Sequence, residues 1–310
     1  MYFPYFRGRQ YELLALKELA TKGLISSSIV PVVEPVKMIS TQAAAVKAYK
    51  NAGLPLALIF NPMVGELAKG TDGLSPLLPF IADDVIPALL TSATLPNTLR
   101  ALNLQGVAAP DILAILNNRD YLNVYVNEFG SISPRFTLLP DERSVRRAAR
   151  ENKVIFEDKF AKRNRNADYP EDEFFSEDHL YYEEEGYVGF GDYSIIGDEY
   201  VESGFAPYAV AIHIIYFADD KTMRVRHFTS DSNDDTSDVA GKFYEAVSKL
   251  AHWWHRFSQE SILKPQMTSG LQAFLDHYSN HTYPGLPTVK KLSIMHHLEL
   301  VQKFLEGGIA

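Results

Sequence analysis

The sequence of 310 residues contains no cysteine. This absence excludes disulfide bonds, zinc and iron–sulfur sites built on thiolates, and cysteine nucleophiles. No apolar run approaches the roughly 20 residues of a membrane-spanning helix, so we expect no segment inside a bilayer. The chain opens with an apolar stretch and only then reaches Arg7 and Arg9, which reverses the order found in a secretory signal. We therefore expect a cytoplasmic protein.

Motifs that identify common enzyme classes are also missing. The sequence has no P-loop, no Gly-x-Gly-x-x-Gly after a strand, no Gly-x-Ser-x-Gly elbow and no His-Glu-x-x-His pair. His252 and His255 have helical spacing, as have His277 and His281, but neither pair has a third ligand at a useful distance along the chain. We expect no metal site of this kind, and no motif identifies a cofactor.

Charge is distributed unevenly along the chain. The net charge of −9 argues against broad nucleic-acid binding, which depends on neutralising phosphates. Nine lysines and arginines lie between Arg143 and Arg165, whereas residues 166–220 contain none. One interpretation is that the two segments neutralise one another or lie on separate solvated faces. The other is a phosphate or nucleotide site in which Arg146 and Arg150, one helical turn apart, supply the cations.

The first ninety residues contain a repeated pattern. Four times a proline lies in a short apolar run that ends in a polar or charged residue, at residues 3–7, 29–34, 54–61 and 85–91. The prolines are 27, 24 and 32 residues apart, close to the roughly 30 residues of one βαβ unit. Helix-like sequence follows at least the first two runs. The pattern predicts a TIM-like (β/α)8 barrel, with some irregularity.

The rest of the chain continues this pattern less regularly. Residues 160–186 carry much charge without a clean period, which predicts an insertion or lid. Residues 209–217 and 223–228 predict an antiparallel hairpin, and residues 238–310 a helical C-terminal part. No linker marks a second domain, so we expect one barrel domain over residues 1–310. The further expected elements are strands at residues 106–109, 122–127, 135–139, 154–157 and 187–190, and helices at 111–118 and 144–152.

The opening YFPYFRGRQYELLALKEL, followed by IVPVVEPVK, is similar to the beta family of proteins, which is named for a phage protein and is also widespread in bacteria. The match is specific over the first 37 residues and looser in GFGDYSIIGDEY and FAPYAVAIHIIYF. The resemblance implies a β/α barrel and a link to the contest between phage and bacteria, bacterial members often lying beside genes for restriction-nuclease-like proteins. It implies no particular reaction. The residues that carry it are Arg7, Gly8, Arg9, Glu12 and Glu34.

The carboxyl ends of the strands of such a barrel meet at one mouth, where Arg7, Glu34, Asn61 and Thr91 would form a ring. Arginine, glutamate and lysine from neighbouring strand ends could bind an anion and move a proton. The alternative is that Arg9 pairs with Glu12 or Glu34 and locks the turn. We expect catalytic roles for Arg9, Glu34, Asp192 and His213, and ligand-binding roles for Arg7, Lys37, Asn61, Asp158 and Lys159.

Two of these expectations have open alternatives. Asp158, Lys159 and Asp192 end later strands, and carboxylates meeting at the mouth could bind Mg²⁺ or act as an acid and base pair. Isolated acids at strand ends are common, so we expect no metal. His213 lies in the apolar run AVAIHIIYF, where it is either a hydrogen-bonded core residue or, if it points into the barrel, a general acid or base.

These observations lead to one main hypothesis of function. It is a cytoplasmic barrel protein of bacterial antiviral defence that binds a small anionic ligand, such as a nucleotide, and hydrolyses or senses it. The alternative is a non-catalytic scaffold or regulator of a nuclease-like partner, with the acidic residues 171–185 as a docking face or nucleic-acid mimic. A third hypothesis is direct nucleic-acid binding through residues 143–165, with an affinity that falls steeply as salt is added.

Overall fold

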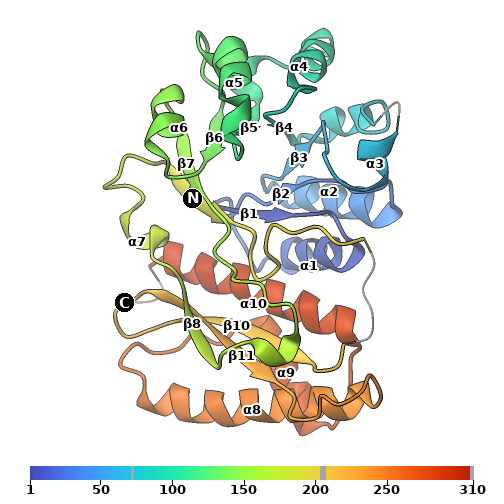
Figure 1. The fold of residues 1–310 in the computed structure, drawn as a ribbon, viewed down its shortest axis with the longest axis vertical. Helices are drawn as coiled ribbons and strands as arrows, with labels where there is room; N and C mark the ends of the chain where they lie inside the picture. Colours follow the sequence, from blue (N-terminus) through green and yellow to red (C-terminus); the bar gives the residue numbers. More distant parts are fainter. Residues whose placement is uncertain (71–72, 203–206, 308–310) are drawn as a thin grey trace. The chain divides into compact units, whose positions relative to one another are not determined.

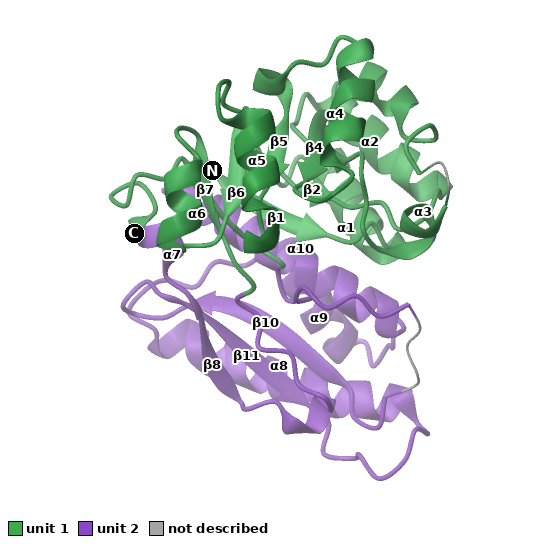
Figure 2. Cartoon of the chain, turned by 45° about the horizontal axis from the view of Figure 1, so that its top comes forward, with its two compact units in different colours: residues 1–158, 181–193 green, residues 159–180, 194–310 purple. Residues whose placement is uncertain are grey.

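The computed structural model describes residues 1–70, 73–202 and 207–307, and the chain divides into two compact units. Unit 1 comprises residues 1–158 and 181–193, and unit 2 comprises residues 159–180 and 194–310 (Figure 2). Compactness does not measure independent folding, so the expectation of a single domain stays a prediction.

Unit 1 contains a closed barrel of eight parallel strands in the order β1-β2-β3-β4-β5-β6-β7-β9 (Figure 1). β9 closes the barrel against β1, where Tyr2 is paired with Phe190. The predicted TIM-like (β/α)8 barrel is confirmed. The strands are β1 (Tyr2–Phe6), β2 (Val32–Val33), β3 (Ala57–Ile59), β4 (Ile86–Leu90), β5 (Leu113–Ile115), β6 (Phe136–Leu139), β7 (Lys153–Phe156) and β9 (Gly189–Asp192).

Helices alternate with these strands, as the βα pattern requires. Leu13, Leu16 and Leu19 form the buried stripe of the first helix, which agrees with the helical period of the sequence. The helices are α1 (Gln10–Thr21), α2 (Ser40–Ala52), α3 (Gly65–Lys69), α4 (Leu95–Leu104), α5 (Leu122–Phe129) and α6 (Arg143–Ala148), with short 3-10 helices η1 (Leu78–Asp83), η2 (Ala109–Asp111) and η3 (Arg119–Tyr121).

The prediction of the fifth strand was wrong. A helix was expected at residues 111–118, but β5 lies there, and the strand expected at residues 106–109 is absent from the described structure. All three residues of β5 are completely buried. A strand buried on both faces is a continuous apolar run, and periodicity cannot distinguish such a run from part of a buried helix.

The sixth strand was also misplaced, since residues 122–127 were expected to form it and lie instead in α5. α5 buries Tyr125 and Phe129, which are four residues apart. This is the helical period, but it extends over only two turns. β6 lies at the expected later strand, residues 135–139.

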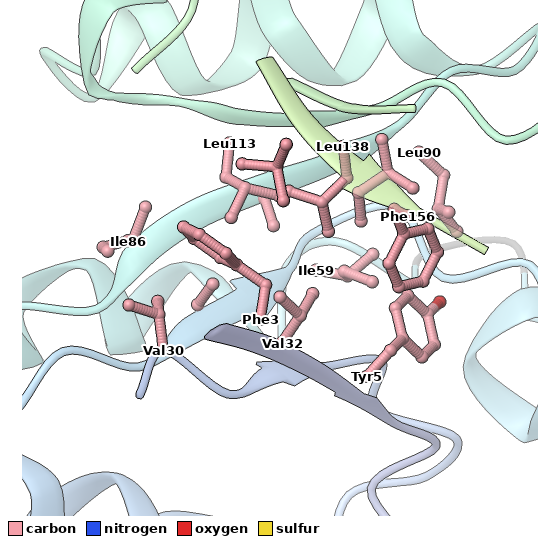
Figure 3. Close-up of a cluster of buried hydrophobic side chains, with 14 of the residues drawn as sticks. Phe3, Tyr5, Val30, Val32, Ile59, Ile86, Leu90, Leu113, Leu138 and Phe156 are labelled. Carbon is pink, nitrogen blue, oxygen red and sulfur yellow. The ribbon is translucent and has the colours of Figure 1, made fainter. Parts of the chain in front are cut away.

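The interior of the barrel is filled by apolar side chains from its strands (Figure 3). Phe3, Tyr5 and Phe156 are the largest labelled members of this cluster, and each is almost completely buried. Gly191 makes room for Phe3 and Phe156, because an added Cβ would lie 2.5 Å from the carbonyl oxygen of Phe3 and 3.1 Å from the ring of Phe156. Large rings on β1 and β7 are therefore matched by a missing side chain on β9.

Unit 2 contains a three-stranded sheet in the order β10-β11-β8. Both pairings are antiparallel, and the expected hairpin and C-terminal helices are confirmed. Residues 160–186 contribute one strand of this sheet. Among the described residues, no helix has both the length and the apolar composition needed to cross a membrane. The elements are η4 (Asn166–Asp168), β8 (Asp172–Ser176), β10 (Ala211–Phe217), β11 (Met223–Thr229), α8 (Val239–Glu260), α9 (Ser269–Ser279) and α10 (Leu286–Leu305), and α7 (Asp178–Tyr181) leads back to unit 1.

Candidate ligand site at the barrel mouth

Arg7 and Glu34 form an ion pair at the carboxyl ends of β1 and β2. The side chain of Glu34 is completely buried, whereas 14% of the Arg7 side chain is exposed. The carboxylate also accepts hydrogen bonds from the Tyr5 hydroxyl at 2.7 Å and from the backbone N–H of Met63 at 2.6 Å. A buried carboxylate is stable only with such partners, and here they come from two separate segments of unit 1, the end of β1 and the residues after β3.

The guanidinium of Arg7 lies over two aromatic rings. Its Cζ is 5.1 Å from the ring centre of Tyr5 and 5.7 Å from that of Tyr193. The rings of Tyr5, Tyr193 and Phe156 contact one another, with centres 4.9 to 5.8 Å apart. A cation is attracted to the faces of such rings. The aromatic rings and the carboxylate therefore fix the position of the guanidinium at the mouth.

The protonation states in this cluster are also fixed. Burial raises the pKa of Tyr5 well above its usual value, and the neighbouring Glu34 carboxylate raises it further. Burial alone would lower the pKa of Arg7, but its interactions with Tyr5, Glu34 and Tyr193 outweigh that effect and raise it. Tyr5 is therefore a neutral hydrogen-bond donor and Arg7 a cation near neutral pH, and neither is suited to act as a general base.

Gly8 allows β1 and β2 to approach at this point. Its φ of +60° lies in the left-handed region, and an added Cβ would lie 2.9 Å from the carbonyl oxygen of Glu34. A larger residue would be strained and would push the two strand ends apart. Gly8 thus turns the chain sharply at the end of β1 and keeps Arg7 within reach of Glu34.

Polar contacts continue from strand to strand around the mouth. The Asn61 amide donates a hydrogen bond to the carbonyl of Leu90 and accepts one from its N–H, both at 2.8 Å. The Thr91 hydroxyl donates to the carbonyl of Ile115 at 2.9 Å. Together with the ion pair, these bonds connect the ends of β1 to β5 in order. Asn61 and Thr91 thus lie at the expected mouth, where their bonds to neighbouring strands hold the barrel together.

Arg9 and Lys37 are placed differently from Arg7. Arg9 precedes the first turn of α1, and its backbone N–H donates to the Glu12 carboxylate at 3.2 Å. The alternative from the sequence was a pair of Arg9 with Glu12 or Glu34, and the structure shows Glu34 in an ion pair with Arg7. Lys37 is exposed in the segment after β2. Of the two arginines around Gly8, the structure therefore brings Arg7 to the buried carboxylate.

The later strand ends do not add carboxylates to this cluster. Asp192 accepts a hydrogen bond from the Tyr2 hydroxyl at 2.8 Å. The next residue, Tyr193, points into the barrel interior, and successive side chains of a strand point to opposite faces. Asp192 therefore lies on the outer face of β9. Asp158 is exposed at the end of unit 1, and Lys159 forms a 2.9 Å ion pair with Asp178 in unit 2. Within the described ranges, no three His, Asp or Glu side chains converge on a metal site.

His213 lies on β10 of unit 2 and not on a barrel strand. Its Nδ1 is 2.7 Å from Nδ1 of His227, whose Nε2 is 3.0 Å from the Glu173 carboxylate. Neither His227 nor Glu173 is among the site residues predicted from the sequence. Counting outward from the hairpin turn would have found one of them, because the register places His213 directly opposite His227.

Three ion pairs in unit 2 join the basic segment to the acidic one. Lys159 pairs with Asp178, Lys162 with Glu199 at 2.6 Å and Arg163 with Glu173 at 2.7 Å. These pairs support the interpretation that the two segments neutralise one another. Arg146, the first residue of the proposed phosphate site, forms an ion pair with Asp141 at 2.8 Å. The structure therefore gives no sign of a phosphate site at Arg146 and Arg150.

The chain matches no protein-family model, no curated protein and no solved structure.

Proposed function

We propose that this protein is a beta-family barrel of bacterial antiviral defence that binds a small anionic ligand, such as a nucleotide, at the carboxyl ends of the barrel strands. The resemblance of the first 37 residues supports the family and the defence role. The observation that carries the ligand proposal is the position of Arg7, a partly exposed cation seated on Tyr5 and Tyr193. Ligands of this fold bind at the same end of the barrel.

The surroundings of Arg7 favour an anion as the ligand. A guanidinium that is already oriented loses little side-chain freedom when it binds an oxyanion, and its planar donors fit carboxylate and phosphate groups. Glu34 holds Arg7 from the buried side and is itself engaged by three donors. Because Tyr5 and Arg7 are not suited to be general bases and the Glu34 carboxylate already accepts from three donors, the proposal is one of binding or sensing rather than hydrolysis.

The alternative of a scaffold that docks a nuclease-like partner on residues 171–185 has less support. Glu171, Asp172, Glu173 and Asp178 all form ion pairs with basic side chains of unit 2. Much of the negative charge of this segment is therefore neutralised within the fold, and less of it is left to attract a basic partner or to imitate nucleic acid.

Native mass spectrometry of protein purified from bacterial cells tests the proposal. The wild type should retain a small anionic molecule that the double variant Arg7→Met with Glu34→Gln loses. Removing Arg7 alone would leave a buried, uncompensated charge, at a cost of about 3–5 kcal/mol. The double variant avoids this cost, because the glutamine oxygen can accept from the N–H of Met63 while its NH2 group donates to the Tyr5 hydroxyl.

Arg135→Met is a matched control. Arg135 also lies over an aromatic ring, that of Phe136 at 5.8 Å, but it precedes β6 and so belongs to the opposite end of the barrel. This variant should keep the ligand. Retention of the same ligand by the folded double variant would refute the site. A wild type that arrives empty and shows no calorimetric binding of ATP or inorganic phosphate would refute the proposal as a whole.

A further inference from the structure

A chain of hydrogen-bonded side chains crosses the sheet of unit 2. Nη2 of Arg163 is 2.7 Å from Oε2 of Glu173, and Oε1 of Glu173 is 3.0 Å from Nε2 of His227. Nδ1 of His227 is in turn 2.7 Å from Nδ1 of His213. Glu173, His227 and His213 lie on β8, β11 and β10, so the chain connects all three strands. We call these four residues the histidine relay.

The positions of the hydrogens in the relay follow from these distances. Two ring nitrogens 2.7 Å apart need one hydrogen between them, because two lone pairs or two N–H groups would repel at that distance. The ionised carboxylate of Glu173 only accepts, so Nε2 of His227 carries a hydrogen. In the neutral pair, Nδ1 of His227 is therefore the acceptor and Nδ1 of His213 the donor.

The pair can take up one proton and keep this contact, but not two. One added proton occupies Nε2 of His213, the bridging hydrogen stays, and the carboxylate of Glu173 balances the charge. A second proton would bring two N–H groups and two positive charges face to face across 2.7 Å. The pair therefore titrates as one unit, and its second protonation breaks the contact.

The groups around the pair act on its protonation in opposite directions. Burial lowers the pKa of His213 and of His227, and for His213 the neighbouring His227 and Lys290 lower it further. Glu173 and Asp172 favour protonation of His227, whereas Arg163 opposes it. The facing groups come from four places: Glu173 and Asp172 from β8, Arg163 and Tyr169 from the segment before it, Lys290 from α10, and the two histidines from the hairpin.

Side chains of residues 159–176 contact this pair, in addition to the backbone pairing of β8 with β11 and the ion pairs that Asp172 and Glu171 make with β11. Tyr169 stacks on His227 with ring centres 4.7 Å apart. The rings of Phe160 and His213 form an edge contact with centres 5.1 Å apart. Glu173 and Arg163 also belong to this segment, and Glu173 is hydrogen-bonded to both Arg163 and His227. A break between the two histidines therefore disturbs the side chains that hold β8 and the segment before it.

We propose that the contact between His213 and His227 is an acid-sensitive latch, which holds residues 159–176 on the β10–β11 hairpin and opens when both rings are protonated. In the open state the two rings are hydrated and recover ordinary histidine basicity, so acid favours opening by linkage. Opening would leave the edge of β11 without its β8 partner, and an unpaired strand edge is a site for pairing with another chain.

Hydrogen exchange measured by mass spectrometry at decreasing pH, corrected for the intrinsic exchange rates, tests the latch. Protection of residues 159–176 should fall at least about tenfold per pH unit once opening is linked to proton uptake. Residues 239–260 of α8 should stay protected over the same range. In His213→Gln the response of residues 159–176 should be lost, since an amide can present either N–H or oxygen to His227. His255→Gln, at an exposed position of α8, should respond like the wild type.

Two results would overturn the latch. Simultaneous loss of protection in both segments would indicate general acid unfolding, and an unchanged response in His213→Gln would show that this pair is not the sensor. Nitrogen NMR of labelled histidine gives an independent test at neutral pH. It should find the hydrogen on Nδ1 of His213 and on Nε2 of His227, and any other pair of tautomers would contradict the hydrogen-bond scheme.

Discussion

The side-chain amide of Asn61 forms two hydrogen bonds of 2.8 Å with the backbone of Leu90, one to its carbonyl and one from its N–H. β3 ends at Ile59, and the N–H of Phe60 still donates to the Ala88 carbonyl at 2.9 Å, so the Asn61 amide extends the pairing with β4 beyond that point. Asn61 and Leu90 are both buried. A short strand is thus lengthened by a side chain at the end of the barrel where the candidate site lies.

Replacing Asn61 by alanine should destabilise the protein by roughly 2–4 kcal/mol, because two buried backbone groups of Leu90 lose their partners. Asn61→Asp should cost at least as much, since a carboxylate cannot donate to the Leu90 carbonyl. The midpoint of urea unfolding measures both effects. Asn97→Ala, at an exposed position of α4, should change stability by less than about 0.5 kcal/mol. A similar midpoint for Asn61→Ala and Asn97→Ala would show that the amide contributes little.

Arg7 and Glu34 should be strongly coupled in a double-mutant cycle. Arg7→Met leaves the buried Glu34 charge without its cation and should cost about 3–5 kcal/mol, whereas Arg7→Met with Glu34→Gln should be less damaging than the sum of the two single changes. Urea unfolding of the four proteins gives the coupling energy. Additive effects would mean that the other donors to Glu34 stabilise its charge without Arg7.

Gly191→Ala tests the packing of the barrel interior. The added methyl group would meet the backbone of Phe3 and the ring of Phe156, so we expect a loss of about 1–3 kcal/mol or more from overpacking. Gly186→Ala is a useful comparison, because that position is open but has a φ of +80°. It should cost only about 1 kcal/mol through backbone strain. Equal losses would mean that the interior near β9 yields more easily than the distances indicate.

The barrel could be predicted because its first four strands repeat a pattern of proline, branched apolar residues and a polar end. The site could be predicted only in part. Residues 3, 5 and 7 share the inner side of β1, and counting in twos along that strand selects Arg7 rather than the residue beyond the Gly8 turn. The same count fails on β9, since its inner positions are Gly189 and Gly191, which leave no apolar pattern to show that Asp192 points outward.

Stability should fall as the pH is lowered from about 6.5 toward 4, because unit 2 buries several neutral histidines. Burial lowers the pKa of His179 to about 4 and that of His296 to about 4, and burial with the neighbouring His296 lowers that of His297 to about 3. Above the ordinary histidine pKa, both folded and unfolded chains are neutral at these sites. Below it the unfolded chain takes up protons first, so each residue removes on the order of 3 kcal/mol of folding free energy by pH 4.

His179→Gln isolates one of these contributions. Nε2 of His179 lies 2.8 Å from the carbonyl of Lys221, and a glutamine amide can donate to that carbonyl without titrating. The free energy of unfolding in urea, measured from pH 7 to pH 4.5, should therefore fall less steeply for His179→Gln than for the wild type, while the two proteins differ little at pH 7. The exposed substitution His255→Gln should leave the slope unchanged. Parallel curves for the wild type and His179→Gln would mean that His179 is protonated as readily in the folded chain as in the unfolded one.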